Sequence, residues 1–159
     1  YFRLSGVDIA LFGIAFSVSL FLSAMAQKYA YRFEDWFGMK TGLFIATIIP
    51  GVLYVLMAFT FHPLLAILFF AGIMTFNGLQ TPLFSEYKNV HIKDHNRATV
   101  LSLVSMFSSI YLVVMNLIVG ALADVNISYS FLLMGLIIII ASVWLRIDES
   151  HVDLPQSVQ

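Results

Sequence analysis

The chain has 159 residues, of which 60% are hydrophobic and only 11% are charged, and its mean hydropathy is +0.93. Soluble globular proteins carry about 25% charged residues, so this composition excludes that class and predicts an integral membrane protein. The net charge is -1 and no basic cluster occurs beyond the predicted loops, which gives no reason to expect nucleic acid as a partner. The absence of cysteine excludes disulfides and thiol chemistry.

The first two uncharged stretches predict three membrane-spanning helices. A helix crosses the hydrocarbon core with about 20 residues, and the stretch from Ile9 to Gln27 has this length. The stretch from Thr41 to Ser85 is too long for one crossing and has His62-Pro63 near its middle. We therefore predict that it forms two helices joined by a tight turn.

The rest of the chain predicts two more helices. No residue between Ala98 and Ala123 is charged, and a further apolar stretch runs from Ser128 to Leu145. The predicted fold class is all-α: a polytopic membrane bundle of five transmembrane helices within one unit, residues 1–147. Residues 148–159 are polar and are expected to form a disordered cytoplasmic tail. The predicted helices cover residues 7–30, 39–61, 63–86, 97–123 and 128–146.

The distribution of Lys and Arg predicts the orientation. Five crossings place the two ends of the chain on opposite sides, and every Lys and Arg except Arg3 falls on the side of the carboxyl terminus. By the positive-inside rule that side is cytoplasmic, in an inner or plasma membrane. The amino terminus then lies outside, although the chain starts at Tyr1 with no signal sequence. We therefore expect at least one upstream span to be missing.

Polar side chains mark the third and fourth predicted helices. Asn77, Gln80 and Thr81 are spaced i, i+3 and i+4, so they share one helical face, and Pro82 is expected to interrupt the backbone hydrogen bonds just beyond them. Helices that line a water-filled path need polar groups, whereas helices that face lipid do not. The second and fifth helices carry almost no polar side chains. We therefore predict that the third and fourth helices are an inner pair and that the second and fifth are peripheral.

The fourth helix also has one polar face. At about 100° per residue, Ser102, Ser105, Ser109 and Asn116 fall within about 60° of one another. An unpaired amide deep in a membrane is costly, so Asn116 must have a partner of some kind.

The first helix has a different pattern. Small residues, namely Ala15, Ser19, Ser23 and Ala26, repeat every three to four positions on one face. Such a stripe allows two backbones to approach closely. We predict a helix that packs tightly against a neighbour or partly lines a cavity.

Two segments carry a resemblance to a known family. Residues Asn96 to Leu103, which open a long helix that ends with Gly120 to Asp124, resemble helix eleven of major facilitator superfamily transporters. The segment Asp35 to Lys40 resembles the second-half copy of the loop signature Gly-x-x-x-Asp-Arg-x-Gly-Arg-Lys of this family. Asp35, Gly38 and Lys40 match this signature, whereas Tyr31 and Trp36 depart from it.

The resemblance implies a secondary transporter of twelve helices in two halves, which binds a small-molecule substrate near the midplane and works by alternating access. The five spans would then be helices eight to twelve of the carboxyl-terminal half, embedded in the lipid bilayer, with the amino-terminal half of the same transporter missing. In this family helices nine and twelve are peripheral and helices eight, ten and eleven face the cavity. The polar content of the helices leads to the same assignment.

Two sets of candidate residues follow, each with a structural alternative. The substrate-binding set can instead form hydrogen bonds between helices, and its serines can bond to their own helix backbone. The gating set can instead be solvated charges at the cytoplasmic surface. The substrate-binding candidates are Asn77, Gln80, Thr81, Asn116, Ser105 and Ser109. The gating candidates are Asp35, Gly38, Lys40 and Arg97.

Neither an enzyme nor a metal or cofactor site is predicted. No catalytic motif is present, and no carboxylate lies inside a span, so proton coupling would reside in the missing part. His91 and His95 have a spacing that could hold a metal with Glu86 or Asp94, but the segment gives no regular helix signal and has no cysteine. The alternative to a transporter is a complete five-span accessory or assembly subunit that docks a partner through the polar face of the fourth helix.

Overall fold

The structure is a computed structural model that describes residues 1–91 and 97–144, without the side chains of 89–91 and 97. It contains five α-helices, preceded by a short 3-10 turn at Ile9–Leu11. All five are long and apolar enough to cross a membrane, which confirms the all-α polytopic prediction. The helices are α1 (Phe12–Lys28), α2 (Ala30–Phe59), α3 (Pro63–His91), α4 (Arg97–Val125) and α5 (Ile127–Trp144).

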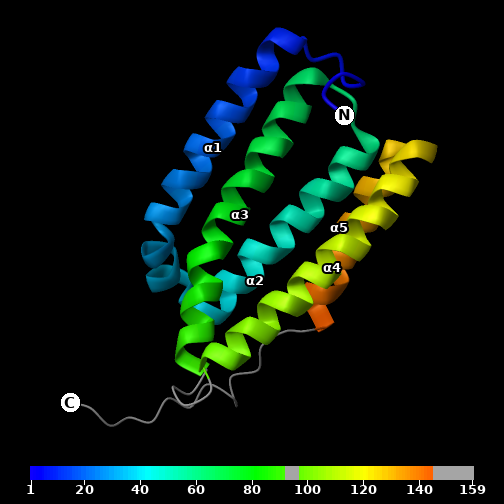
Figure 1. The fold of residues 1–159 in the computed structure, drawn as a ribbon. Coiled ribbons are helices and arrows are strands. Elements are labelled where there is room, and N and C mark those ends of the chain that lie inside the picture. Colours follow the sequence, from blue (N-terminus) through cyan, green and yellow to red (C-terminus); the bar gives the residue numbers. More distant parts are fainter. Residues whose placement is uncertain (92–96, 145–159) are drawn as a thin grey trace.

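The helices form an open row in the order α1, α3, α2, α5, α4 (Figure 1). Extensive contacts join α1 to α3, α3 to α2 and α2 to α5, and a smaller contact joins α5 to α4. No substantial contact joins α3 to α4 within the described residues. Helices α3 and α4 are therefore not direct neighbours in this row, because α2 and α5 lie between them. That α3 and α4 are the pair facing a water-filled path stays a prediction. Polar content reports whether a helix meets water or lipid, and it does not specify its neighbours.

Small residues make the closest helix crossings. A Cβ atom at Gly78 of α3 would meet the Ser23 side chain and backbone of α1, and a Cβ atom at Gly135 of α5 would lie 2.7 Å from the Gly51 carbonyl oxygen of α2. On α1, Ala15 and Ser19 are buried. This confirms that the small-residue face of α1 packs tightly against a neighbour, which is α3.

Four Lys and Arg residues gather where α1 ends, α2 begins and α3 ends (Figure 1). We call this the basic end. The amino terminus lies at the opposite end, where the Tyr1 hydroxyl donates to the Thr60 carbonyl oxygen in the turn between α2 and α3. The residues of the basic end are Lys28, Arg32, Lys40 and Lys88.

The polar segment after α1 is helical. The resemblance to the family signature suggests a loop here, but α2 begins at Ala30, directly after Tyr29. The helical path is broken instead at Gly38, where φ is 74° and ψ is 157°. Residues with side chains rarely adopt this conformation, so the glycine permits the break. The polar segment is thus a short helical piece set at an angle to the rest of α2.

Pro82 does not end its helix. Helix α3 continues from Pro63 through Pro82 to His91, and α2 likewise contains Pro50. A proline removes one backbone hydrogen bond. The other backbone groups of a membrane helix find no water to bond to, so they keep their hydrogen bonds only if the helix continues. The predicted interruption is therefore local.

Candidate functional site

The three polar candidates on α3 do not behave alike. Asn77 and Thr81 are exposed, whereas Gln80 is half-buried. The Gln80 amide donates a hydrogen bond of 2.9 Å to the Thr47 hydroxyl on α2, and that hydroxyl donates to the Leu43 carbonyl oxygen of its own helix at 2.7 Å. Gln80 therefore joins α3 to α2 by a hydrogen bond between helices. This is the alternative to substrate binding that the sequence also allows for this residue.

Thr81 and Asn77 share the exposed face of α3. The Thr81 hydroxyl donates to the backbone carbonyl oxygen of Asn77 at 3.1 Å, so its hydrogen-bonding need is met within the helix. The Asn77 side-chain amide makes no hydrogen bond with the described part of the chain. Asn77 stands midway between the two ends of α3, at the depth where a bilayer is driest.

The hydrogen bond between Gln80 and Thr47 gives a testable coupling. We expect a double-mutant cycle of Gln80→Leu and Thr47→Val to give a coupling free energy of about 1 kcal/mol, because buried hydrogen bonds between membrane helices reach about 0.6–1.7 kcal/mol. The measurement is the unfolding free energy of the four variants in mixed micelles. Additive effects of the two substitutions would mean that the amide of Gln80 is free to serve another partner.

The polar face of α4 is not covered by another described helix. We call this face, which carries Ser102, Ser105, Ser109 and Asn116, the polar stripe. None of the described side chains of α4 is buried, and within the described residues its one substantial helix contact is with α5. The Ser109 hydroxyl donates to the Ser105 carbonyl oxygen at 2.9 Å, so Ser109 is satisfied within its helix. The Asn116 amide, which is exposed, makes no hydrogen bond with the described residues. Asn116 is therefore the polar group of α4 that most needs an external partner.

The structure thus separates the candidates by a physical criterion. Two side-chain amides, those of Asn77 and Asn116, are exposed and lack a partner among the described residues, whereas Gln80, Thr81 and Ser109 each have one. An amide that faces lipid without a hydrogen bond costs about 2–7 kcal/mol. Both amides therefore require water, a ligand or another protein segment next to them.

Three of the four gating candidates, Asp35, Gly38 and Lys40, lie at the basic end. Asp35 is exposed on the short helical piece before Gly38, and Lys40 is half-buried just after it. Sequence reasoning missed a further feature of this end: Glu34 of α2 and Glu86 of α3 are close enough for their charges to interact. Two like charges that lie close together repel each other. This pairing was hidden because the residues are far apart in the sequence.

Substitution of Gly38 tests the break in α2. We expect Gly38→Ala to lower the unfolding free energy by about 1–3 kcal/mol, because alanine must then adopt a backbone conformation reserved for glycine. Thermal unfolding in detergent measures the change. Gly13→Ala is the matched control, since Gly13 has open space around it and ordinary backbone angles. A stabilised Gly38→Ala protein would show that α2 is continuous at this position.

Three further candidates lie partly or wholly outside the described residues. Helix α4 begins at Arg97, and α3 ends at His91, but neither side chain is described, and His95 lies outside the described residues. The expected tail, residues 148–159, also lies outside them. In the part of the chain that is described, no group of three or more metal-ligating side chains comes together.

A row of membrane-crossing helices with an uncovered polar face defines the chain as a polytopic α-helical membrane protein. Comparison with protein families then identifies the class more closely. The profile of the Major Facilitator Superfamily matches residues 3–158, and the chain belongs to this family. Members of the family are transporters that move small solutes across membranes. Searches of curated proteins and of solved structures gave no match.

Proposed function

We propose that this chain is the carboxyl-terminal part, helices eight to twelve, of a secondary active transporter that moves a small solute by alternating access. In this assignment α1 is helix eight and α5 is helix twelve. The substrate would bind between this unit and the amino-terminal half of the same protein.

The observation that carries the proposal is the uncovered polar stripe of α4. Among the described residues α4 makes one substantial helix contact, with α5, and Asn116 is exposed. Exposure of this amide to lipid would be unfavourable. A water-filled path along this face, bounded by the other half of the transporter, would supply hydrogen-bond partners for the Asn116 amide. Within the described residues, no substantial contact between α1 and α4 closes the row.

The residue roles follow from the hydrogen bonds. Asn77 and Asn116 are the substrate-contacting candidates, because each presents an amide without a partner in the described residues. Ser105 and Thr81 contribute to the same polar surfaces, and Gln80 and Ser109 act mainly in the structure of the bundle. The basic end faces the cytoplasm by the positive-inside rule, in an inner or plasma membrane. Asp35, Gly38, Lys40 and Arg97 then belong to the cytoplasmic gate.

One other function agrees with the same observation. A complete five-span subunit could cover the polar stripe of α4 by docking a partner helix on it. This alternative needs no water-filled path, and it predicts that the stripe is dry in the assembled complex.

The length of the native reading frame separates the two proposals. For the transporter we expect coding sequence upstream of Tyr1 for about seven more membrane spans, which is roughly 200 residues or more. A start codon within a few residues of Tyr1 would contradict the transporter proposal and favour the accessory subunit.

A further inference from the structure

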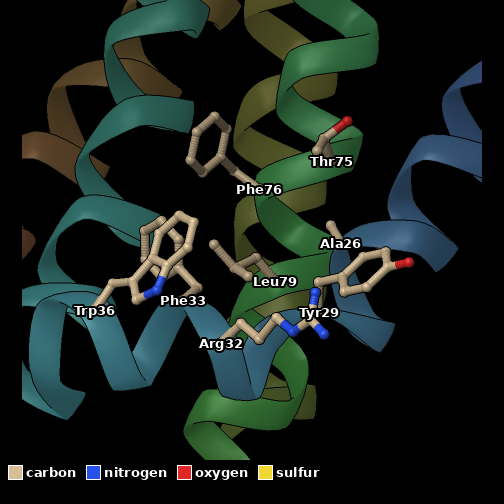
Figure 2. Close-up of a pocket in the computed structure, with 8 residues that line it drawn as sticks. All are labelled: Ala26, Tyr29, Arg32, Phe33, Trp36, Thr75, Phe76 and Leu79. Carbon is tan, nitrogen blue, oxygen red and sulfur yellow. The ribbon is translucent and has the colours of Figure 1, made fainter.

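A pocket at the basic end lies apart from the polar stripe. It has a volume of about 410 Å³ and is lined by eight residues from α1, α2, α3 and the junction at Tyr29 (Figure 2). No residue of α4 or α5 is among them. The volume falls within the range of about 300–1,000 Å³ that is typical of small-molecule sites. The lining residues are Ala26, Tyr29, Arg32, Phe33, Trp36, Thr75, Phe76 and Leu79.

The lining is apolar except at one rim. Figure 2 shows the rings of Phe33 and Trp36 on α2 on the same side as Phe76 of α3, with Arg32 at the rim next to Tyr29. Thr75 adds little polarity, because its hydroxyl donates to the Ala71 carbonyl oxygen at 2.7 Å. The pocket thus combines an apolar interior with a cation at its edge.

Two cations flank the same ring at this rim. The guanidinium carbon of Arg32 lies 5.5 Å from the centroid of the Tyr29 ring, and the Lys28 amine lies 5.6 Å from it. Within the described residues, no carboxylate pairs with Arg32. The guanidinium therefore keeps N–H donors that fit a phosphate group.

The depth of the pocket agrees with the geometry of a lipid. Trp36 is 81% exposed and stands near the start of α2, as aromatic residues do at the level of the headgroups. Phe76 lies on α3 more than about 20 Å from the end of that helix at His91, at about 1.5 Å per residue. The pocket therefore extends from the membrane surface into the hydrocarbon region. Anionic lipids are concentrated in the cytoplasmic leaflet, which the basic end faces in the proposed orientation.

We propose that this pocket binds one anionic phospholipid, with an acyl chain among Phe33, Phe76 and Leu79 and the phosphate on Arg32 and Lys28. The proposal goes beyond transport, because it assigns a lipid site on a face that the polar stripe does not share. It requires that the chain is embedded in a membrane, but it does not require that the chain transports a solute.

Quenching of Trp36 by brominated lipids tests the site. The chain has two tryptophans, and Trp144→Phe leaves Trp36 as the single fluorophore. The full chain is reconstituted in vesicles of dioleoyl phosphatidylcholine that contain either brominated phosphatidylglycerol or brominated phosphatidylcholine at the same mole fraction. We expect the anionic lipid to bind about fivefold more tightly, since one Arg near the membrane surface contributes about that factor.

Three variants make the outcome decisive. Arg32→Gln should remove most of the preference, whereas Lys88→Gln, at the same end but outside the pocket, should retain it. Thr75→Phe should fill the pocket and weaken the quenching by the anionic lipid without changing any charge. If the preference for the anionic lipid survives both Arg32→Gln and Thr75→Phe, the proposal is overturned. General electrostatic attraction of anionic lipids to the basic end would then explain the preference.

Two other results would also contradict the site. Equal quenching by the two brominated lipids would show that the pocket does not select an anionic headgroup. Loss of the preference on addition of inorganic phosphate would show that the cations bind free anions rather than a lipid. The lipids are present in both leaflets, so neither result depends on orientation or transport, and failure here leaves the transporter proposal untouched.

Discussion

Gly135→Val is expected to prevent the bundle from folding. A Cβ atom at Gly135 would lie 2.6 Å from Val55 Cγ2, 2.7 Å from the Gly51 carbonyl oxygen and 2.9 Å from the Val55 backbone nitrogen. Two of these three neighbours are backbone atoms, which cannot move away without separating α2 from α5. We expect a loss of about 3 kcal/mol or more, a large part of the roughly 5–15 kcal/mol that stabilises a typical protein.

The matched control for this variant is Gly13→Val. Gly13 is also helical, but a Cβ atom there would meet nothing within 4 Å. Size-exclusion chromatography in detergent and thermal unfolding measure both variants. If the Gly135→Val protein were as stable as the Gly13→Val protein, this would contradict the close crossing of α2 and α5.

Asn116→Leu is expected to reduce transport by the complete reading frame about fivefold. Loss of one hydrogen bond to a bound solute corresponds to about 1 kcal/mol, whereas a tenfold change would require about 1.4 kcal/mol. Asn77→Leu should have a similar effect, because its amide also lacks a partner in the described residues. The measurement is uptake into proteoliposomes of the solute that a screen of labelled small molecules identifies.

Ser108→Ala is the control for this loss. The Ser108 hydroxyl donates to the Val104 carbonyl oxygen at 2.8 Å and serves its own helix, so uptake should be unchanged. Normal uptake by Asn116→Leu at an equal level of protein would exclude the amide from the solute pathway.

The sequence predicted the helices well because uncharged length is a direct signal of membrane crossing. The turn at His62-Pro63 and the tight packing of the small residues on α1 were also predictable. The order of the helices was not, because α5 and the part of α2 after Lys40 are nearly uniformly apolar and show no face that specifies a partner. Their crossing depends on Gly51 and Gly135, which lie far apart in the sequence.

The candidate site was predicted in part. Sequence spacing brought Asn77, Gln80 and Thr81 onto one side of α3, but it could not distinguish them. Of the three, Gln80 donates a hydrogen bond to Thr47, which belongs to α2 and lies far away in the sequence. The helical character of the segment before Gly38 was also missed, because its charges are typical of a loop.

The reaction of single cysteines on α4 tests most directly whether its polar stripe lines a water-filled path. The chain contains no cysteine, so Asn116→Cys and Val114→Cys can be compared in the complete protein, with any other cysteines replaced. The two positions point about 160° apart on the helix, and both side chains are exposed in the structure. A membrane-impermeant, charged maleimide should modify Asn116→Cys at least about tenfold faster, because the thiolate forms only in contact with water. Equal rates, or no reaction at Asn116→Cys, would contradict a solute pathway along this face.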